Sequence, residues 1–164
     1  DWVLTQIPSY NVSIVIFSII WGMVVLIFIR TIRSPSIYIT YCWTLILICF
    51  ARAVSITLVP LDPPHGFRTL TDPITGIFYG NVMITKDLFF SGHTSTMFLI
   101  FLCLERRTDK LIALLGVTLV AGLLLVQHVH YTIDVLIAPF MVYVCYLTTR
   151  HFLYNYRIKV PADC

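Results

Sequence analysis

Long apolar runs separated by short polar links dominate the chain, and they predict a bundle of membrane-spanning helices. A bilayer core of about 30 Å requires about 20 apolar residues per helix. Five segments approach this length, and we expect helices over residues 11–29, 36–58, 87–104, 111–130 and 132–154. The pattern therefore predicts an all-α, polytopic membrane helical bundle, with residues 1–164 forming a single domain.

The composition supports a membrane location and argues against nucleic acid as a partner. Hydrophobic residues make up 59% of the chain and charged residues only 12%, whereas a soluble domain carries about 25% charged residues. The net charge of +3 is small, and Lys and Arg form no clustered stripe of the kind that binds nucleic acid. The five cysteines do not fall in close pairs, which predicts neither a zinc site nor a disulfide framework.

Basic residues are concentrated at one end of the expected bundle. The links "RTIR" and "ERRTDK" and the C-terminal tail place eight of the eleven Lys and Arg residues on one side: Arg30, Arg33, Arg106, Arg107, Lys110, Arg150, Arg157 and Lys159. The positive-inside rule makes that side cytoplasmic. We therefore expect the long segment 59–86, the start of the third helix and the junction of the last two helices on the non-cytoplasmic side.

The stretch "DLFFSGHTST" opens the third expected helix on that non-cytoplasmic side. Gly92 lets the backbone approach a ligand closely, and Ser91 can cap the start of the helix. The free N–H groups at a helix start favour an anion such as phosphate. His93 would then lie beside the bound anion and could act as a proton donor.

The junction "QHVHYTIDV" carries a dense polar cluster between two apolar runs. His130 and Asp134 are four residues apart, so a helical junction would place them on one face, one turn apart. A carboxylate hydrogen-bonded to one ring nitrogen fixes the tautomer and makes the other nitrogen a better nucleophile. Arg52, the single charge in the second expected helix, lies in its outer third and can pair with Asp134.

Two other interpretations of these polar residues stay open at this point. The histidines can be hydrogen-bonding groups between helices with no catalytic role. A metal site made of His128, His130 and Asp134 is the second alternative. Residues two apart on a helix do not face each other, so His128 and His130 would need a non-helical junction. We predict that the site uses no metal and no cofactor.

The polar motifs together resemble those of the sphingomyelin synthase family, within the wider type 2 phosphatidic acid phosphatase superfamily. The matching stretches are "DLFFSGHT" and "HYTIDV", and "ARAVSITLVPLDPP" resembles the motif that precedes them. The resemblance covers residues 36–150, and the compact chain is similar to bacterial relatives of the family. It implies a catalytic triad of His93, His130 and Asp134. We expect the neighbouring residues to bind the phosphate or headgroup: Arg52, Asp87, Ser91, Gly92, Thr94, His128 and Tyr131.

The resemblance implies a membrane-embedded lipid phosphotransferase with its active site on the outer membrane face. A phosphohistidine at His130 would carry the headgroup from a phospholipid donor to a lipid alcohol such as ceramide or diacylglycerol. Leu123 and Leu124 stand where the broader phosphatases carry a Ser-Arg pair, which favours the transferase. The alternatives are a lipid phosphate phosphatase that uses water, and a non-catalytic lipid-binding or scaffold protein. The family usually has six membrane helices, one more than we expect here.

Overall fold

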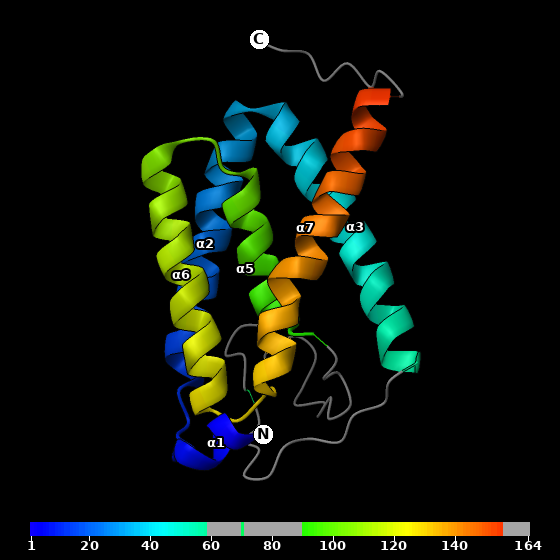
Figure 1. Ribbon diagram of the computed structural model, residues 1–164. Coiled ribbons are helices and arrows are strands. Elements are labelled where there is room, and N and C mark those ends of the chain that lie inside the picture. Colours follow the sequence, from blue (N-terminus) through cyan, green and yellow to red (C-terminus); the bar gives the residue numbers. More distant parts are fainter. Residues whose placement is uncertain (59–69, 71–89, 156–164) are drawn as a thin grey trace, which may run out of the picture.

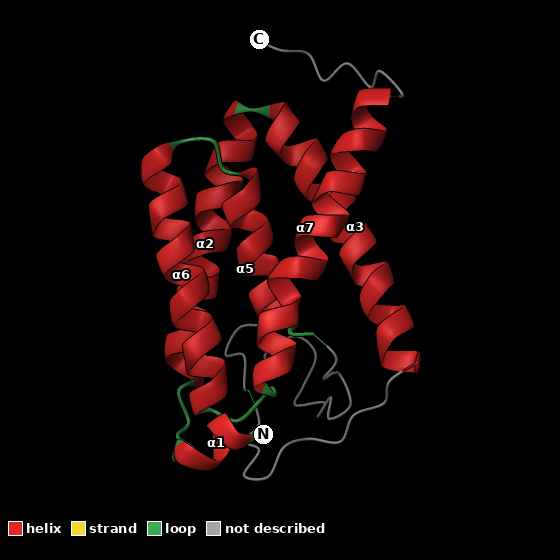
Figure 2. Ribbon diagram, viewed as in Figure 1, coloured by secondary structure: helices red, strands yellow, loops and turns green. Residues whose placement is uncertain are grey.

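Six α-helices make up the part of the chain that the structure describes, which is residues 1–58, 70 and 90–155. This computed structural model has no strand in those residues, and Figure 2 shows the helices as one bundle. In chain order the helices are α1 (Trp2–Gln6), α2 (Ser13–Arg33), α3 (Pro35–Leu58), α5 (Gly92–Cys103), α6 (Arg107–Val126) and α7 (Thr132–Asn155). The predicted all-α class is confirmed.

Four of these helices, namely α2, α3, α6 and α7, are long and apolar enough to cross a membrane. Large apolar side chains are exposed along them, among them Phe28, Ile32, Phe50, Leu111, Leu136 and Phe140. Helices with apolar side chains on the outside are what the hydrocarbon core of a bilayer requires, because a helix bonds its backbone groups internally. The described residues therefore form the polytopic bundle expected of an integral membrane protein.

The basic link "RTIR" between the first two long helices is part of helix α2. This helix runs to Arg33, four residues past its predicted end at residue 29, and only Ser34 separates it from α3. Arg30 and Arg33 lie in its last turn, where the helix dipole favours positive charge. Pro35 is the first residue of α3, a position that suits its fixed φ and its missing N–H.

Helix α5 lies at the centre of the bundle and contacts α2, α3, α6 and α7 (Figure 1). Met97, Leu99 and Ile100 on this helix are fully buried. Gly116 on α6 makes room for one of them, because a Cβ atom there would lie 3.0 Å from the terminal methyl carbon of Met97. The helix that carries the "SGHT" motif is therefore enclosed by all four membrane-length helices.

This central helix is shorter than the predicted helix over residues 87–104. Within the described residues it begins at Gly92 and ends at Cys103. Phe90 has a φ of 46°, outside the helical region, and Ser91 is the extended N-cap residue. Its 12 residues rise only about 18 Å, whereas the bilayer core is about 30 Å thick. The described residues thus contain four helices of membrane-spanning length and one shorter apolar helix, in agreement with the expectation of about five.

The fourth predicted helix, over residues 111–130, is displaced towards the N-terminus. Helix α6 starts at Arg107 and ends at Val126, so the last four predicted residues form a turn instead. His128 within that turn has a φ of 55°, in the left-handed region that a helix cannot continue through. The charged start of α6 is possible because Asp109 in its first turn pairs with Arg30 of α2.

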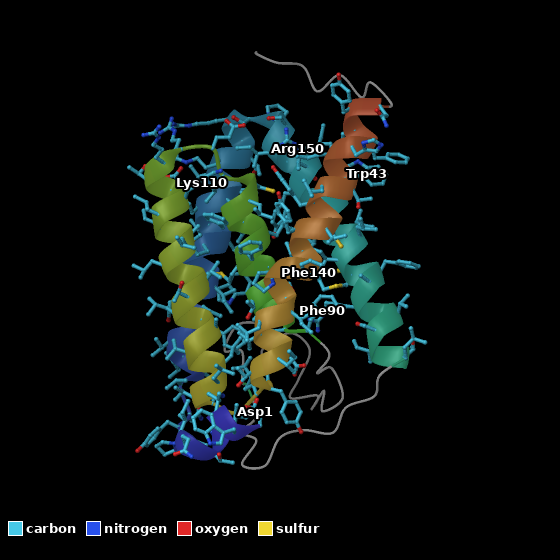
Figure 3. All side chains as sticks on the ribbon, in the orientation of Figure 1. Asp1, Trp43, Phe90, Lys110, Phe140 and Arg150 are labelled. Carbon is cyan, nitrogen blue, oxygen red and sulfur yellow. The ribbon has the colours of Figure 1, made fainter. Side chains whose placement is uncertain are left out.

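The alternating directions of the helices give the bundle two distinct ends. The site end holds the starts of α2, α5 and α7 and the ends of α3 and α6 (Figure 1). The basic end holds the other termini, with Arg30, Arg33, Arg106, Arg107, Lys110 and Arg150. Figure 3 shows Lys110 and Arg150 towards one end of the molecule and Asp1 at the other. The predicted segment 59–86, Asp87, Arg157 and Lys159 lie outside the described residues, apart from Leu70.

Candidate active site

The start of α5 is fixed by Ser91, as its sequence predicts. The Ser91 side-chain oxygen accepts a hydrogen bond from the backbone N–H of Thr94 at 3.4 Å, and Ser91 is fully buried. The Ser95 hydroxyl donates to the Ser91 carbonyl oxygen at 2.7 Å. This N-cap leaves other N–H groups of the first turn directed at the site end, where they favour an anion.

Arg52 of α3 reaches the same helix start. Its Nη1 atom donates to the Phe90 carbonyl oxygen at 2.7 Å, and its guanidinium carbon lies 5.5 Å from the centre of the Phe90 ring. A Cβ atom on Gly92 would lie 2.6 Å from the same Nη1 atom. The sequence predicts that Gly92 permits a close approach by a ligand, and the structure gives that space to the Arg52 guanidinium.

His130 and Asp134 lie together at the start of α7, although their junction is not helical. Asp134 is in the first turn of α7, whereas His130 precedes Thr132, the first helical residue. The His130 Nδ1 atom lies 4.0 Å from Asp134 Oδ2, and the two side chains are 5% and 2% exposed. The predicted one-turn spacing on a helix is therefore wrong, but the pairing is present at ion-pair distance.

Asp134 is also held by its own helix. Its Oδ2 atom accepts a hydrogen bond from the backbone N–H of Tyr131 at 3.1 Å, as a carboxylate three residues after the N-cap does in a capping box. This bond fixes the carboxylate next to the turn that carries His130. Tyr131, predicted to bind the headgroup, takes part here through its backbone.

One backbone hydrogen bond joins the two motifs. The N–H of Ser91 donates to the carbonyl oxygen of Asp134 at 3.2 Å, which ties the start of α5 to the first turn of α7. The "SGHT" and "HYTIDV" stretches are thus adjacent, as the topology predicts. Figure 3 places Phe90, the residue before Ser91, between α7 and α3.

His93 is half-buried in the first turn of α5, two residues after this tie. Its ring meets the Phe17 ring of α2 edge to face, with 5.8 Å between the ring centres and 79° between the planes. The residue that contacts His93 therefore comes from α2, a helix in which the sequence indicates no site residue.

The remaining predicted binding residues have different surroundings. His128 is buried, and its Nε2 atom lies 2.9 Å from the carbonyl oxygen of Ile7 in the N-terminal segment. Thr94 is 1% exposed, and its hydroxyl has no hydrogen-bond partner among the described residues. Asp87 lies outside the described residues.

The metal alternative has little geometric support. Across residues 1–58, 70 and 90–155, no group of three or more His, Cys, Asp or Glu side chains is arranged to hold a metal ion. His128, which would have to be a ligand, has its Nε2 atom beside the Ile7 carbonyl oxygen.

Gln127 is a residue of this region that sequence reasoning missed. It is fully buried, its Oε1 atom accepts from the backbone N–H of Val12 at 3.2 Å, and its Nε2 atom donates to the Ser13 hydroxyl at 2.7 Å. A glutamine beside an apolar run is a visible signal of a buried polar contact. Its partners could not be predicted, because they lie 115 and 114 residues away in the chain.

Fold and site together define a class: an integral membrane helical bundle with a buried histidine–aspartate pair beside a capped helix start. Residues 86–152 match the family described as PAP2 superfamily C-terminal, a range that covers α5, α6 and most of α7. The match supports the type 2 phosphatidic acid phosphatase superfamily, whose members are phosphatases and phosphotransferases acting on lipid phosphates. Neither the curated proteins nor the solved structures gave a match.

Proposed function

We propose that this protein is a membrane-embedded lipid phosphotransferase of the sphingomyelin synthase-like type. It moves a phospho-headgroup from a phospholipid to a lipid alcohol. The observation that carries this proposal is the buried His130–Asp134 pair, at 4.0 Å, joined to the "SGHT" helix start by the hydrogen bond from Ser91 to Asp134. The family match of residues 86–152 supports the reaction class.

The phosphate is bound where positive charge and N–H donors meet. The Arg52 guanidinium lies against Gly92 at the start of α5, and the first turn of that helix presents its N–H groups there. The buried Thr94 hydroxyl adds a donor in the same turn. Such groups stabilise the negative charge that spreads over the phosphate oxygens in the transition state.

The first step transfers the headgroup to His130. Asp134 faces Nδ1, so Nε2 is the nucleophile. Nε2 forms a bond to phosphorus while the bond from phosphorus to the diacylglycerol oxygen breaks. Protonated His93 gives its proton to that oxygen, and diacylglycerol leaves as a neutral alcohol. Asp134 stabilises the positive charge on the phosphorylated imidazole ring.

The second step returns the enzyme to its starting state. The hydroxyl oxygen of the acceptor lipid attacks the same phosphorus, and its proton passes to the now neutral His93. The bond between phosphorus and His130 breaks, and the acceptor leaves with the headgroup. Ceramide and diacylglycerol are acceptors with suitable hydroxyl groups.

A lipid phosphate phosphatase is the second candidate, because the matched superfamily includes phosphatases. The same first step would occur, and water would replace the lipid alcohol in the second. Product identity separates the two: a headgroup-bearing lipid for the transferase, or free phosphate released from a lipid phosphate for the phosphatase.

We place the site on the non-cytoplasmic face of the membrane. The support is the position of the described basic residues at the opposite end of the bundle from the start of α5. The positive-inside rule favours that basic end on the cytoplasmic side.

The test is replacement of the nucleophile, with an exposed histidine at the opposite end of the bundle as control. Proteoliposomes receive donors with a labelled headgroup together with ceramide and diacylglycerol. We expect His130→Ala to lower turnover by about 10⁴-fold or more and to abolish an acid-labile, base-stable phosphoprotein. His151→Ala is the control, since His151 is exposed near the basic end of α7 and contacts Asn155. Full turnover by His130→Ala would disprove the proposed mechanism.

A further inference from the structure

The first turns of α2 contact the start of α5, which carries "SGHT", and the turn that precedes "HYTIDV". Ser13 and Phe17 are four residues apart, so they share one face of the helix, and both are buried. Ser13 meets the junction between α6 and α7, whereas Phe17 meets the start of α5. A single rigid helix therefore touches the neighbourhoods of His130 and His93 at once.

The contact with the junction runs through Gln127. Both ends of its amide are bonded: Oε1 to the N–H of Val12 at 3.2 Å and Nε2 to the Ser13 hydroxyl at 2.7 Å. The Ser13 hydroxyl in turn donates to Asn11 at 2.9 Å.

The turn that follows Gln127 is bonded back to α6. The Gln127 N–H donates to the Leu123 carbonyl oxygen at 2.9 Å, and the Val129 N–H donates to the Leu124 carbonyl oxygen at 3.1 Å. His130 is the next residue, so the position of its backbone follows that of Gln127. The side-chain bonds of Gln127 thus link the nucleophile to the start of α2.

The contact with α5 is between the rings of Phe17 and His93, with their centres 5.8 Å apart. An edge-to-face aromatic pair restricts the rotation of both rings. Phe17 is 6% exposed and belongs to the packed face of α2, so it gives His93 a fixed neighbour.

We propose that the first turns of α2 act as a bracket that sets the relative position of the two catalytic histidines. Gln127 and Ser13 position the nucleophile His130, and Phe17 positions the proton donor His93. None of the three touches the reacting atoms, so they are positioning residues. This inference rests on the proposed function, because it assigns the bracket a role in the same two-histidine reaction.

The two contacts of the bracket have different expected effects, because Phe17 positions the proton donor and Gln127 with Ser13 positions the nucleophile. A proton donor is needed only when the leaving group is a poor one, such as the alkoxide of diacylglycerol. A p-nitrophenolate group leaves without protonation. In the first step, a defect in the position of His93 should therefore disappear with a p-nitrophenyl donor, whereas a defect in the position of His130 should remain.

The experiment compares two donors that carry the same headgroup, one a diacylglycerol ester and the other a p-nitrophenyl ester. Phosphocholine, phosphoethanolamine and phosphate are tried in turn as the headgroup. First-step rates are measured in detergent micelles, as the initial burst of diacylglycerol or p-nitrophenolate released before the acceptor reacts. They are normalised to the monodisperse, folded fraction of each variant. His93→Ala and His130→Ala serve as references for the two defects.

We expect Phe17→Leu to lower the rate with the diacylglycerol donor about tenfold, and the rate with the p-nitrophenyl donor by less than about threefold. Gln127→Leu should lower both rates by a similar factor, about 10- to 100-fold, with little change in KM. Ser13→Ala removes only one of the two side-chain bonds of Gln127, so it should have a smaller effect than Gln127→Leu. Added to Gln127→Leu, it should cost nothing more, because both changes break the same contact.

Two matched controls lie on α2 itself. Ser18→Ala removes a hydroxyl that bonds only within the helix, to the Ile14 carbonyl oxygen at 2.7 Å. Phe28→Leu removes an exposed ring. Both should keep the rates of the unchanged protein with either donor. Phe17→Met and Ser13→Ala replace the main variants if those do not fold.

The possible outcomes distinguish failure of the bracket from failure of the proposed function. If Phe17→Leu lowers both rates equally, or Gln127→Leu lowers only the melting temperature, the bracket is wrong. If His93→Ala shows no preference for the p-nitrophenyl donor, or His130→Ala stays active, the proposed function is wrong. If the unchanged protein uses none of the donors, the proposed function and the bracket are both overturned.

Discussion

Two aspartates occupy the same position in two helices of this bundle, and they have very different partners. Asp109 is the third residue of α6 and Asp134 the third residue of α7. Both are buried, with exposures of 4% and 2%. Asp109 lies at the basic end of the molecule and Asp134 at the site end. The two can therefore be compared at equal burial and equal helix position.

Asp109 is bound by a guanidinium. Arg30 donates through Nε to Oδ2 at 2.7 Å and through Nη2 to Oδ1 at 3.2 Å, a two-bond arrangement that ties the end of α2 to the start of α6. Arginine stays protonated under all ordinary conditions. The pair therefore keeps one charge state, which suits a structural role.

Asp134 has an imidazole in place of the guanidinium. Its Oδ2 atom accepts from the Tyr131 N–H at 3.1 Å and lies 4.0 Å from His130 Nδ1. An imidazole can gain or lose its charge near neutral pH, so this pair can change state during a reaction. The comparison teaches that two carboxylates with equal burial and equal helix position can have very different partners. We expect the partner to decide whether such a carboxylate has a structural role or takes part in the proposed reaction.

Neutralising Asp134 should have the largest effect on turnover. We expect Asp134→Asn to lower turnover by about 10³- to 10⁴-fold, as loss of the orienting carboxylate does in serine proteases. The melting temperature should change little, because an amide oxygen can still accept from Tyr131. The check is labelled-lipid turnover with a thermal melt in detergent. Asp109→Asn should keep the turnover of the unchanged protein when the rate is expressed per folded molecule. Equal losses of turnover in the two variants would contradict the proposed difference between Asp109 and Asp134.

Filling the space at Gly92 should have an intermediate effect. The added Cβ of Gly92→Ala would meet the Arg52 guanidinium, which is the flexible end of a long side chain and can move away. We expect a loss of about 10- to 100-fold in turnover, with the fold retained, because the charge beside the phosphate is displaced.

Gly122→Ala is the matched control for that change, since nothing lies within 4 Å of a Cβ added there. Turnover and melting temperature are measured for both alanine variants. A fully active Gly92→Ala protein would show that Arg52 does not need its present position.

Breaking the pair at the basic end should have the smallest effect on turnover and a clear effect on stability. We expect Asp109→Asn to lower stability by about 2–3 kcal/mol, because it leaves Arg30 without its charged partner in a half-buried position. Replacing both partners, as Arg30→Met with Asp109→Leu, should be nearly neutral. Thermal melts in detergent test both. If the double variant is less stable than the single, the bridge contributes more than packing can replace.

The long helices could be predicted from the sequence because their lengths follow from the bilayer. The predicted ranges for α3 and α7 differ from the observed bounds by one residue at most. The start of α6 at Arg107 was not predictable in this way. Its charged first turn is stabilised by Arg30, which is 79 residues away from Asp109 in the chain.

The candidate residues could be picked out from the sequence, but the contacts that hold them could not. His93, His130 and Asp134 were indicated by the resemblance, and polar residues of this kind are costly between apolar runs unless they have partners. The non-helical turn before α7 and the contact of Phe17 with His93 depend on packing between distant segments, which local spacing cannot indicate.

The short length of α5 has a consequence for the choice of acceptor. A helix of 12 residues falls about 12 Å short of the bilayer thickness, and Figure 1 shows α5 starting inside the bundle, short of the ends of α6 and α7. A phosphate bound at its first turn would sit below the plane of the surrounding headgroups. Bulk water is depleted at that depth, whereas lipid hydroxyl groups arrive by diffusion within the membrane. Under the proposed mechanism, the length of this one helix would favour lipid alcohols over water as the acceptor.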